Sequence, residues 1–195
     1  MKLQKQKANL LTNEESSDST NFGIGDTGVI IDILRRRLYS HPLRTMIQEY
    51  ICNGRDATRE AGSNEKMIVT FPTRLDPVFK VRDFGPGLSP ERVKSVFVLY
   101  GASTKRGDDN QTGGFGIGAK SAWAYTDSFT IVSVYGGKKS TYIAHLGKNS
   151  EGSLDLLDEE STNEATGVEI AVSIQQKDID YAIQCIYRTV YFWDT

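Results

Sequence analysis

Apolar residues recur at helical spacing in the first third of the chain and at strand-like spacing through most of the rest. Positions 29–39 and 42–61 carry apolar side chains three or four residues apart, which predicts two helices. Pro42 suits the first turn of the second helix, and Gly62 suits the position just after its end. Residues 1–21 are rich in Lys, Gln, Asn, Ser and Glu, so we expect a flexible N-terminal arm there.

The remainder of the sequence predicts strands joined by short connections and closed by another helix. The expected strands cover residues 66–71, 78–82, 128–135, 140–146, 153–157 and 167–174. Helices are expected from residue 89, over 119–125 and over 178–192. This order predicts an α+β fold: a two-layer α/β sandwich whose mixed, mostly antiparallel sheet has its helices on one face. Residues 22–195 then form one domain.

Composition narrows the class of protein. A chain of 195 residues with 38% hydrophobic residues can bury the core of one globular domain. The net charge of −2 makes nucleic-acid binding by bulk electrostatics unlikely. No stretch approaches the roughly 20 apolar residues of a membrane helix, so we expect no integral membrane segment and a cytoplasmic location. The two cysteines and two histidines lack metal-ligand spacing, which argues against structural zinc.

Three polar residues of the helix predicted at 42–61 share one stripe. At about 100° per residue, Asn53 lies about 40° from Glu49 around the helix, and Asp56 lies about 20° to the other side. Leu43 and its apolar neighbours supply a separate side for a core. Two carboxylates and an amide aimed in one direction suit an oxygen-rich ligand with a metal ion. A solvated polar face is the alternative.

A glycine turn follows the strand predicted at 78–82. Gly85 and Gly87 can adopt positive φ and allow the backbone to approach a flat ligand closely. Asp83, at the strand end, is placed to accept a hydrogen bond from an exocyclic amine. An ordinary turn is the alternative, because this pattern alone is common.

A second glycine-rich stretch precedes the helix predicted at 119–125. Its residues are Gly113, Gly114, Phe115, Gly116, Ile117 and Gly118. Glycine-rich backbone at a helix N-terminus suits phosphate oxygens. The stretch is not a P-loop, because Ala119 separates the last glycine from Lys120, and it does not follow the first strand of a βαβ unit as a dinucleotide fingerprint does. A flexible linker is the alternative, which the apolar residues between the glycines oppose.

Two further polar residues complete the candidate set. Lys105 lies in the glycine-dense loop before this stretch and could reach a terminal phosphate. Thr166 begins a late strand and could bond a base directly or through water. Alone, the first would be an exposed lysine and the second a turn residue.

Together these segments resemble the GHKL, or Bergerat-fold, ATPase superfamily, which includes Hsp90-type chaperones, DNA gyrase B subunits, MutL proteins and sensor histidine kinases. The motifs match in order over roughly residues 25–175. The matching segments are Glu49-x-x-x-Asn53-x-x-Asp56-Ala57, Asp83-x-Gly85-x-Gly87, the glycines of 113–118 and Thr166-Gly167. The second glycine segment, with Ser121-Ala122 after it, is similar to that of Hsp90-type chaperones.

A closer resemblance is to the amino-terminal part of the rIIA-like lysis-inhibition proteins of tailed phages. It is carried by residues 74–77, 82–87, 113–121 and 125–129. This resemblance implies a fragment or shortened relative of a longer protein. It also implies a role in lysis timing or in host and prophage interaction, in the host cytoplasm and peripheral to the membrane.

The superfamily resemblance implies the ligands and the role of each residue. ATP and Mg²⁺ are the implied cofactors. Asn53 would coordinate Mg²⁺, Glu49 would be the general base for the attacking water, and Asp83 would bind the adenine amino group. The other implied nucleotide-binding residues are Asp56, Ala57, Gly85, Gly87, Leu88, Lys105, residues 113–118 and Thr166.

The resemblance also implies how the activity is controlled. Residues 100–118 would form a lid, from which Lys105 contacts the γ-phosphate. Slow ATP hydrolysis is expected, because lid closure and contacts with a protein partner or a second copy gate this superfamily. The alternative is a nucleotide-regulated protein-binding module without hydrolysis. A histidine-kinase catalytic domain ranks last, since no helix pair with a phosphoacceptor histidine is evident in the sequence.

Overall fold

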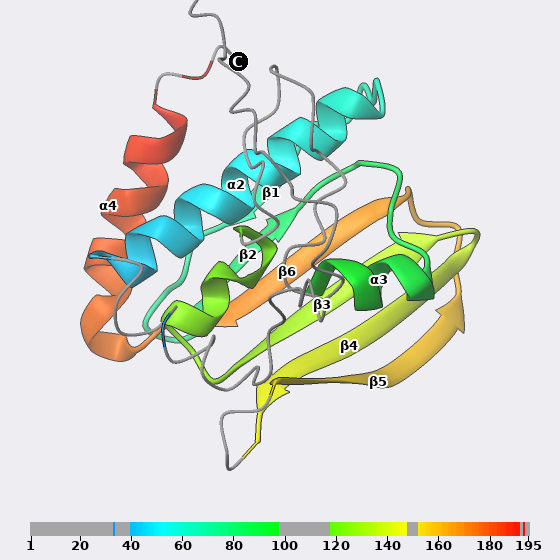
Figure 1. The fold of residues 1–195 in the computed structure, drawn as a ribbon. Coiled ribbons are helices and arrows are strands. Elements are labelled where there is room, and N and C mark those ends of the chain that lie inside the picture. The colour runs from blue at the N-terminus through cyan, green and yellow to red at the C-terminus, as the bar shows by residue number, and fades with distance from the viewer. Residues whose placement is uncertain (1–32, 34–39, 98–117, 148–151, 192, 194–195) are drawn as a thin grey trace, which may run out of the picture.

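One antiparallel sheet forms the base of the molecule. The computed structural model describes residues 33, 40–97, 118–147, 152–191 and 193. Its strands are β1 (Ile68–Thr70), β2 (Val78–Arg82), β3 (Ser128–Tyr135), β4 (Lys138–Leu146), β5 (Gly152–Ser161) and β6 (Gly167–Ser173). They lie side by side in the order β1-β2-β6-β3-β4-β5, and every pairing among these described strands is antiparallel (Figure 1).

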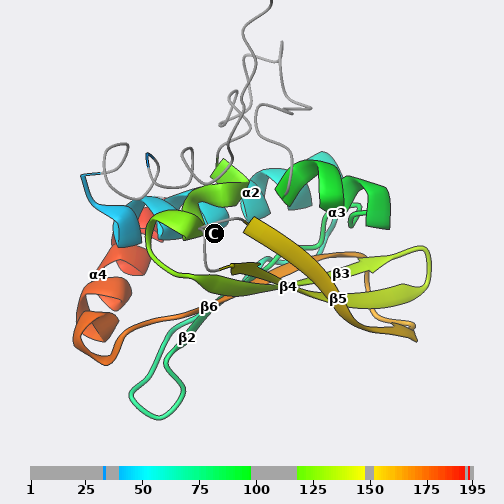
Figure 2. The same ribbon diagram turned by 60° about the horizontal axis from the view of Figure 1, so that its bottom comes forward.

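The helices form a second layer on one face of this sheet, as Figure 2 shows. They are α2 (Pro42–Glu60), α3 (Pro90–Phe97), the 3₁₀ helices η2 (Gly118–Ala124) and η3 (Gln176–Asp178), and α4 (Ile179–Val190). The predicted α+β sandwich with helices on one face is therefore confirmed. No helix among the described residues is long and apolar enough to cross a membrane.

The core lies between α2 and the middle of the sheet. The apolar side of α2 is fully buried there, including Met46, Ile47 and Ile51. Alternate residues of the strands face it, among them Ile131 and Ile170, which are partners in the register of β3 and β6. Side-chain direction repeats every two residues in a strand and about every 3.6 residues in a helix, so each element buries one face. The polar stripe of α2 is thereby left outside the core.

Several element boundaries differ from the sequence expectations. The first strand is shorter than 66–71, and β5 extends to Ser161 because β4 offers it partners along its whole length. Residues 118–124 form a 3₁₀ helix. The helix expected at 29–39, the arm at 1–21 and the lid at 100–118 lie almost wholly outside the described residues, which include only Ile33 and Gly118 of them.

The ends of α2 and α3 follow local sequence signals. Gly62, with φ of +60°, donates its N–H to the carbonyl of Arg59, as expected for a glycine just past a helix end. The N-cap of α2 is His41, which makes no side-chain capping bond, and Pro42 opens the first turn. At α3, Ser89 accepts the N–H of Arg92 at 3.3 Å and caps the helix.

Candidate functional site

Asp83 lies at the end of β2 with almost all of its polar atoms already bonded. Its backbone N–H donates to the carbonyl of Val168 at 2.9 Å. Its Oδ1 accepts the N–H of Gly85 at 2.9 Å and the N–H of Val168 at 3.0 Å. Its carbonyl accepts from Arg82 at 2.8 Å. Among the described residues this leaves Oδ2 as the one polar atom of Asp83 without a hydrogen bond.

Burial changes the acidity of this carboxyl group. The side chain is only 8% exposed, and desolvation raises the pKa of Asp83 above its ordinary value. The N–H groups of Gly85 and Val168, and the charge of Arg82, oppose that rise in pKa. A buried acceptor fixed by backbone donors is a feature of ligand-binding sites more than of surface turns.

Helix α2 is brought unusually close to this carboxyl group. A Cβ atom at Gly54 would lie 2.8 Å from Met67 Sδ, 3.0 Å from Val81 Cγ1 and 3.6 Å from Asp83 Cβ. Met67 Sδ ends a flexible side chain that can shift, but the distance to Val81 Cγ1 of β2 is tighter than that of most real Cβ contacts, so glycine favours this close approach of the helix to β2. Gly54 costs intrinsic helix stability, which the close packing offsets.

Two more contacts join α2 to the first glycine turn. A Cβ atom at Gly85 would lie 2.9 Å from the Cβ of Ala57, so these two predicted site residues are in contact. Thr58 Oγ1 donates to the carbonyl of Gly54 at 2.9 Å and accepts the N–H of Phe84 at 3.1 Å. The turn after β2 is therefore attached directly to the helix.

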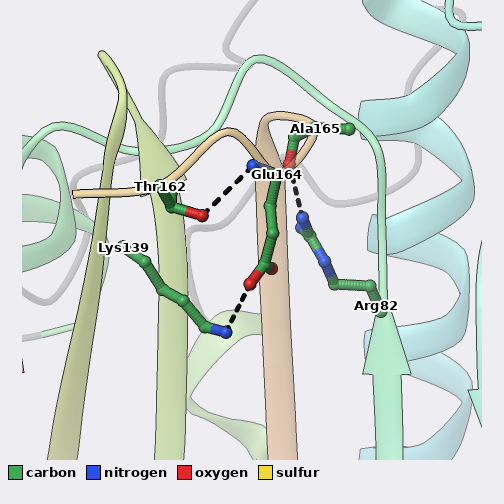
Figure 3. Close-up of polar contacts among 5 residues, drawn as sticks. All are labelled: Arg82, Lys139, Thr162, Glu164 and Ala165. Atoms are coloured by element: carbon green, nitrogen blue, oxygen red, sulfur yellow. Dashed lines mark hydrogen bonds and ion pairs between the residues drawn. The ribbon is translucent and has the colours of Figure 1, made fainter. Parts of the chain in front are cut away.

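The last predicted motif reaches the same turn. Thr166 Oγ1 donates to the carbonyl of Gly85 at 3.0 Å. Figure 3 shows how the connection between β5 and β6 is held: Arg82 Nη2 donates to the carbonyl of Ala165 at 2.6 Å, and Lys139 pairs with Glu164 at 2.6 Å. Thr166 is thus placed beside Gly85, although 81 residues separate them in the sequence.

Gly87 and Leu88 continue the turn onto β3. Gly87 has a φ of +71°, and a Cβ atom there would collide with the backbone oxygen of Val134. The N–H of Leu88 donates to Ser133 Oγ at 2.9 Å, and the same hydroxyl donates to the carbonyl of Leu88 at 2.9 Å. The turn is therefore fixed at both ends, by α2 at Phe84 and by β3 at Leu88.

Glu49 and Asn53 lie together farther along α2, against the end of the second glycine stretch. A Cβ atom at Gly118 would collide with Glu49 Oε2 and lie 3.4 Å from Asn53 Nδ2. Tyr50 donates its hydroxyl hydrogen to the carbonyl of Ala119 at 3.0 Å. At 1.5 Å per residue, Glu49 and Ala57 are about 12 Å apart along the helix axis. One helix thus reaches both the glycine turn after β2 and Gly118 at the start of η2.

A buried lysine follows this contact. The side chain of Lys120 is fully buried, and its Nζ donates to the carbonyl of Val96, in the last turn of α3, at 2.7 Å. Desolvation lowers the pKa of Lys120 to about 8. A cation is well placed at the C-terminal end of a helix, where carbonyl groups lack helical partners. Lys120 thereby attaches η2 to α3.

The remaining predicted site residues differ in how the structure places them. Asp56 lies next to Arg55, with 3.9 Å between Asp56 Oδ1 and Arg55 Nε. Lys105, Gly113, Gly114, Phe115, Gly116 and Ile117 lie outside the described residues. Within the described part of the chain, no three His, Cys, Asp or Glu side chains are grouped so that they could hold a metal ion.

Some residues that shape the site were missed by the sequence reasoning. They are Gly54, Thr58, Arg82 and Ser133. Gly54 had a usable signal, because glycine is unfavourable in the middle of a helix and its presence there suggests a close approach. Arg82 and Ser133 had none, because their partners come from distant segments.

The architecture and the site together define a class. An antiparallel sheet covered on one face by helices, with a buried aspartate at a strand end and with one polar helix against both a glycine turn and Gly118, is the arrangement expected of a GHKL-type ATPase domain. The chain belongs to the histidine kinase-, DNA gyrase B- and HSP90-like ATPase family, whose model matches residues 39–179. No curated protein matches the sequence.

Proposed function

We propose that this chain binds ATP together with Mg²⁺, with adenine at Asp83 and the phosphates toward Glu49, Asn53 and Gly118, and that it hydrolyses the nucleotide slowly. One observation carries the proposal. Oδ2 of a buried, backbone-fixed aspartate is left to accept a hydrogen bond beside one part of α2, while a carboxylate and an amide of the same helix lie against Gly118. The family membership supports the same ligand.

The residues present fit such a ligand. Asp83 Oδ2 can accept the 6-amino hydrogen of adenine, and glycine at position 85 allows the turn to pack against Ala57 beside this acceptor. At the other end, the carboxamide oxygen of Asn53 is the kind of ligand that Mg²⁺ takes, since this ion is usually held by one or two protein groups plus phosphate oxygens and water. When bound, the ion would neutralise developing charge on the phosphates.

Glu49 is the residue of this chain that can handle a proton. Its Oε2 lies beside Gly118 rather than in the core, so a carboxylate is held at the place where the phosphates are proposed to end. A carboxylate so placed can orient a water molecule and accept its proton. Asn53, one turn along the same helix, keeps the amide beside that carboxylate.

The alternative function shares the binding site and differs only in turnover: a nucleotide-regulated module that binds a protein partner without hydrolysis. We propose further that the chain is a relative of the rIIA-like lysis-inhibition proteins of tailed phages, acting in lysis timing or in host and prophage interaction through a partner or a second copy. Motif similarity at 74–77, 82–87 and 125–129 supports this narrower assignment.

Titration calorimetry with ATP, in Mg²⁺ and in excess EDTA, tests the proposal. We expect one saturable site whose affinity for ATP falls when Mg²⁺ is removed, and slow phosphate release in the same buffer. Binding without any phosphate release would favour the regulatory alternative. Equal affinity for ATP and GTP, or no heat of binding for either nucleotide, would contradict the proposed site.

A further inference from the structure

Arg82 stands immediately before Asp83 and bonds to two separate parts of the base end of the site. Its Nη1 donates to the carbonyl of Asp83 at 2.8 Å, and its Nη2 donates to the carbonyl of Ala165 at 2.6 Å. Figure 3 shows the second of these bonds reaching across from β2 to the connection that leads into β6. One guanidinium group therefore bridges Asp83 to the residue just before Thr166.

The surroundings of the guanidinium group keep it in this position. Its Cζ lies 5.1 Å from the centre of the Phe84 ring, so the ring covers one side of it. A Cβ atom at Gly167 would collide with Arg82 Nη1 and with the carbonyl oxygen of Asp83. Gly167 has a φ of +142°, a backbone conformation that residues other than glycine rarely adopt. The space occupied by the guanidinium group exists because residue 167 is glycine.

The bond to the carbonyl matters because of what else holds Asp83. The N–H and Oδ1 of Asp83 are bonded to the backbone of Val168 and Gly85, and of the residues that the structure describes only Arg82 is bonded to its carbonyl oxygen. Loss of the guanidinium group would leave this carbonyl without its donor, and the same peptide would then be held only through the N–H of Phe84, which donates to Thr58 Oγ1, among the bonds of the described residues. A shift of the Asp83 backbone about the remaining bond would move the side chain with it and change the direction in which Oδ2 accepts.

We propose that Arg82 is a positioning residue that sets selectivity for the 6-amino group of the base, by fixing Asp83 and the Ala165-Thr166 segment relative to one another. This inference rests on the proposed function, since it concerns how the same site distinguishes adenine from a purine without that amino group. A lysine at position 82 keeps the charge but cannot span both carbonyls with one planar fork. Its effect should therefore lie between those of arginine and methionine.

The experiment compares affinity for ATP with affinity for purine riboside triphosphate, which carries hydrogen at position 6. It uses the full chain, Arg82→Met and Arg82→Lys, and the matched control Lys139→Met. That control removes the Lys139–Glu164 ion pair, which holds the same connection from β4 without touching Asp83. Thermal melting in each case shows whether the variant is folded.

We expect the wild-type chain to prefer ATP by about tenfold to a hundredfold, the effect of a hydrogen bond to a charged acceptor. Arg82→Met should bring the ratio of the two affinities to within about twofold of unity, Arg82→Lys should give an intermediate ratio, and Lys139→Met should keep the wild-type ratio. A general loss of folding would lower both affinities and leave their ratio unchanged.

Three outcomes would overturn the inference. One is a wild-type ratio in folded Arg82→Met, and another is an equal loss of selectivity in Lys139→Met, which would assign the effect to the connection as a whole. The third is a wild-type chain that binds both nucleotides equally or binds neither, which would remove the proposed adenine site together with this inference. The first two leave the adenine site standing, so the two failures are distinguishable.

Discussion

The two ends of the site on α2 are built in different ways. Around Asp83, backbone N–H groups of β6 and of the glycine turn donate to one buried carboxyl group, and Thr58 of the helix accepts the N–H of the next residue, Phe84. Around Gly118, the polar groups are the side chains of Glu49 and Asn53, which the helix itself presents. A backbone-fixed acceptor suits recognition, whereas polar side chains presented by a helix beside a glycine suit chemistry on a ligand. Variants at the first end should change affinity, and variants at the second should change turnover.

Glu49→Gln should separate the two ends most strongly. Loss of the carboxylate removes the proposed general base, so the rate of phosphate release should fall by about 10²- to 10⁴-fold while ATP affinity is kept. Steady-state phosphate release and calorimetry measure the two quantities. Glu60→Gln, in the exposed last turn of the same helix, is the matched control. A loss of ATP affinity as large as the loss of rate would place Glu49 in the recognition end instead.

Asp83→Asn should have the converse effect. Asn can still accept the N–H groups of Gly85 and Val168 through one oxygen, so the fold should hold, but an NH₂ group would then face the amino group of adenine. ATP affinity should fall by about tenfold to a hundredfold. Asp76→Asn, in the exposed turn before β2, is the control. Undiminished ATP binding by a folded Asp83→Asn variant would contradict the recognition role.

Thr58→Val tests the attachment of the turn to the helix. Valine has nearly the same shape but cannot accept the N–H of Phe84, so the free energy of unfolding should fall by about 1–3 kcal/mol, because that donor is left without a partner. Thr58→Ser keeps the hydroxyl group and should lose less stability. Urea denaturation measures both variants. If valine were as stable as threonine, the bond between Thr58 and Phe84 would not hold the two segments together.

Lys120 gives a pH test of the other end. Its pKa is about 8 in the fold and 10.5 when unperturbed, so between these pH values the unfolded chain binds more protons than the folded chain. The free energy of unfolding should therefore rise with pH across this window relative to that of Lys120→Met. Denaturation of both proteins at pH 7 and pH 10 gives the difference between their free energies of unfolding at each pH. The thiols and tyrosines titrate in both proteins, so their contribution cancels in this difference. A constant difference would mean that the ammonium group is not desolvated.

Much of the candidate site was predictable from local sequence, both around Asp83 and on the polar stripe of α2. A short apolar strand, an aspartate and two glycines at alternate positions are visible without a structure, and so is the stripe that joins Glu49 to Asn53. These features depend on residues close together in the chain, where strand and helix periods decide which side each residue faces.

The supporting contacts were not predictable in the same way. Arg82 reaches Ala165, and Ser133 reaches Leu88, only because strands far apart in sequence pair in one particular register. The length of β5 was also missed, since residues 158–160 are all acidic and show no alternation. Its extent is set by pairing with β4. Pairing between distant segments determines these features, and local secondary-structure propensity does not predict such pairing.

Backbone amide shifts in NMR spectra would test the central claim, one site with two ends, most directly. Adenosine should shift the N–H signals of Gly85 and Val168 and leave that of Gly118 unchanged, whereas ATP with Mg²⁺ should shift all three. Tripolyphosphate with Mg²⁺ should shift Gly118 alone. If ATP shifted the signals at only one end, or if adenosine acted at Gly118, the turn after Asp83 and Gly118 would not belong to one nucleotide site.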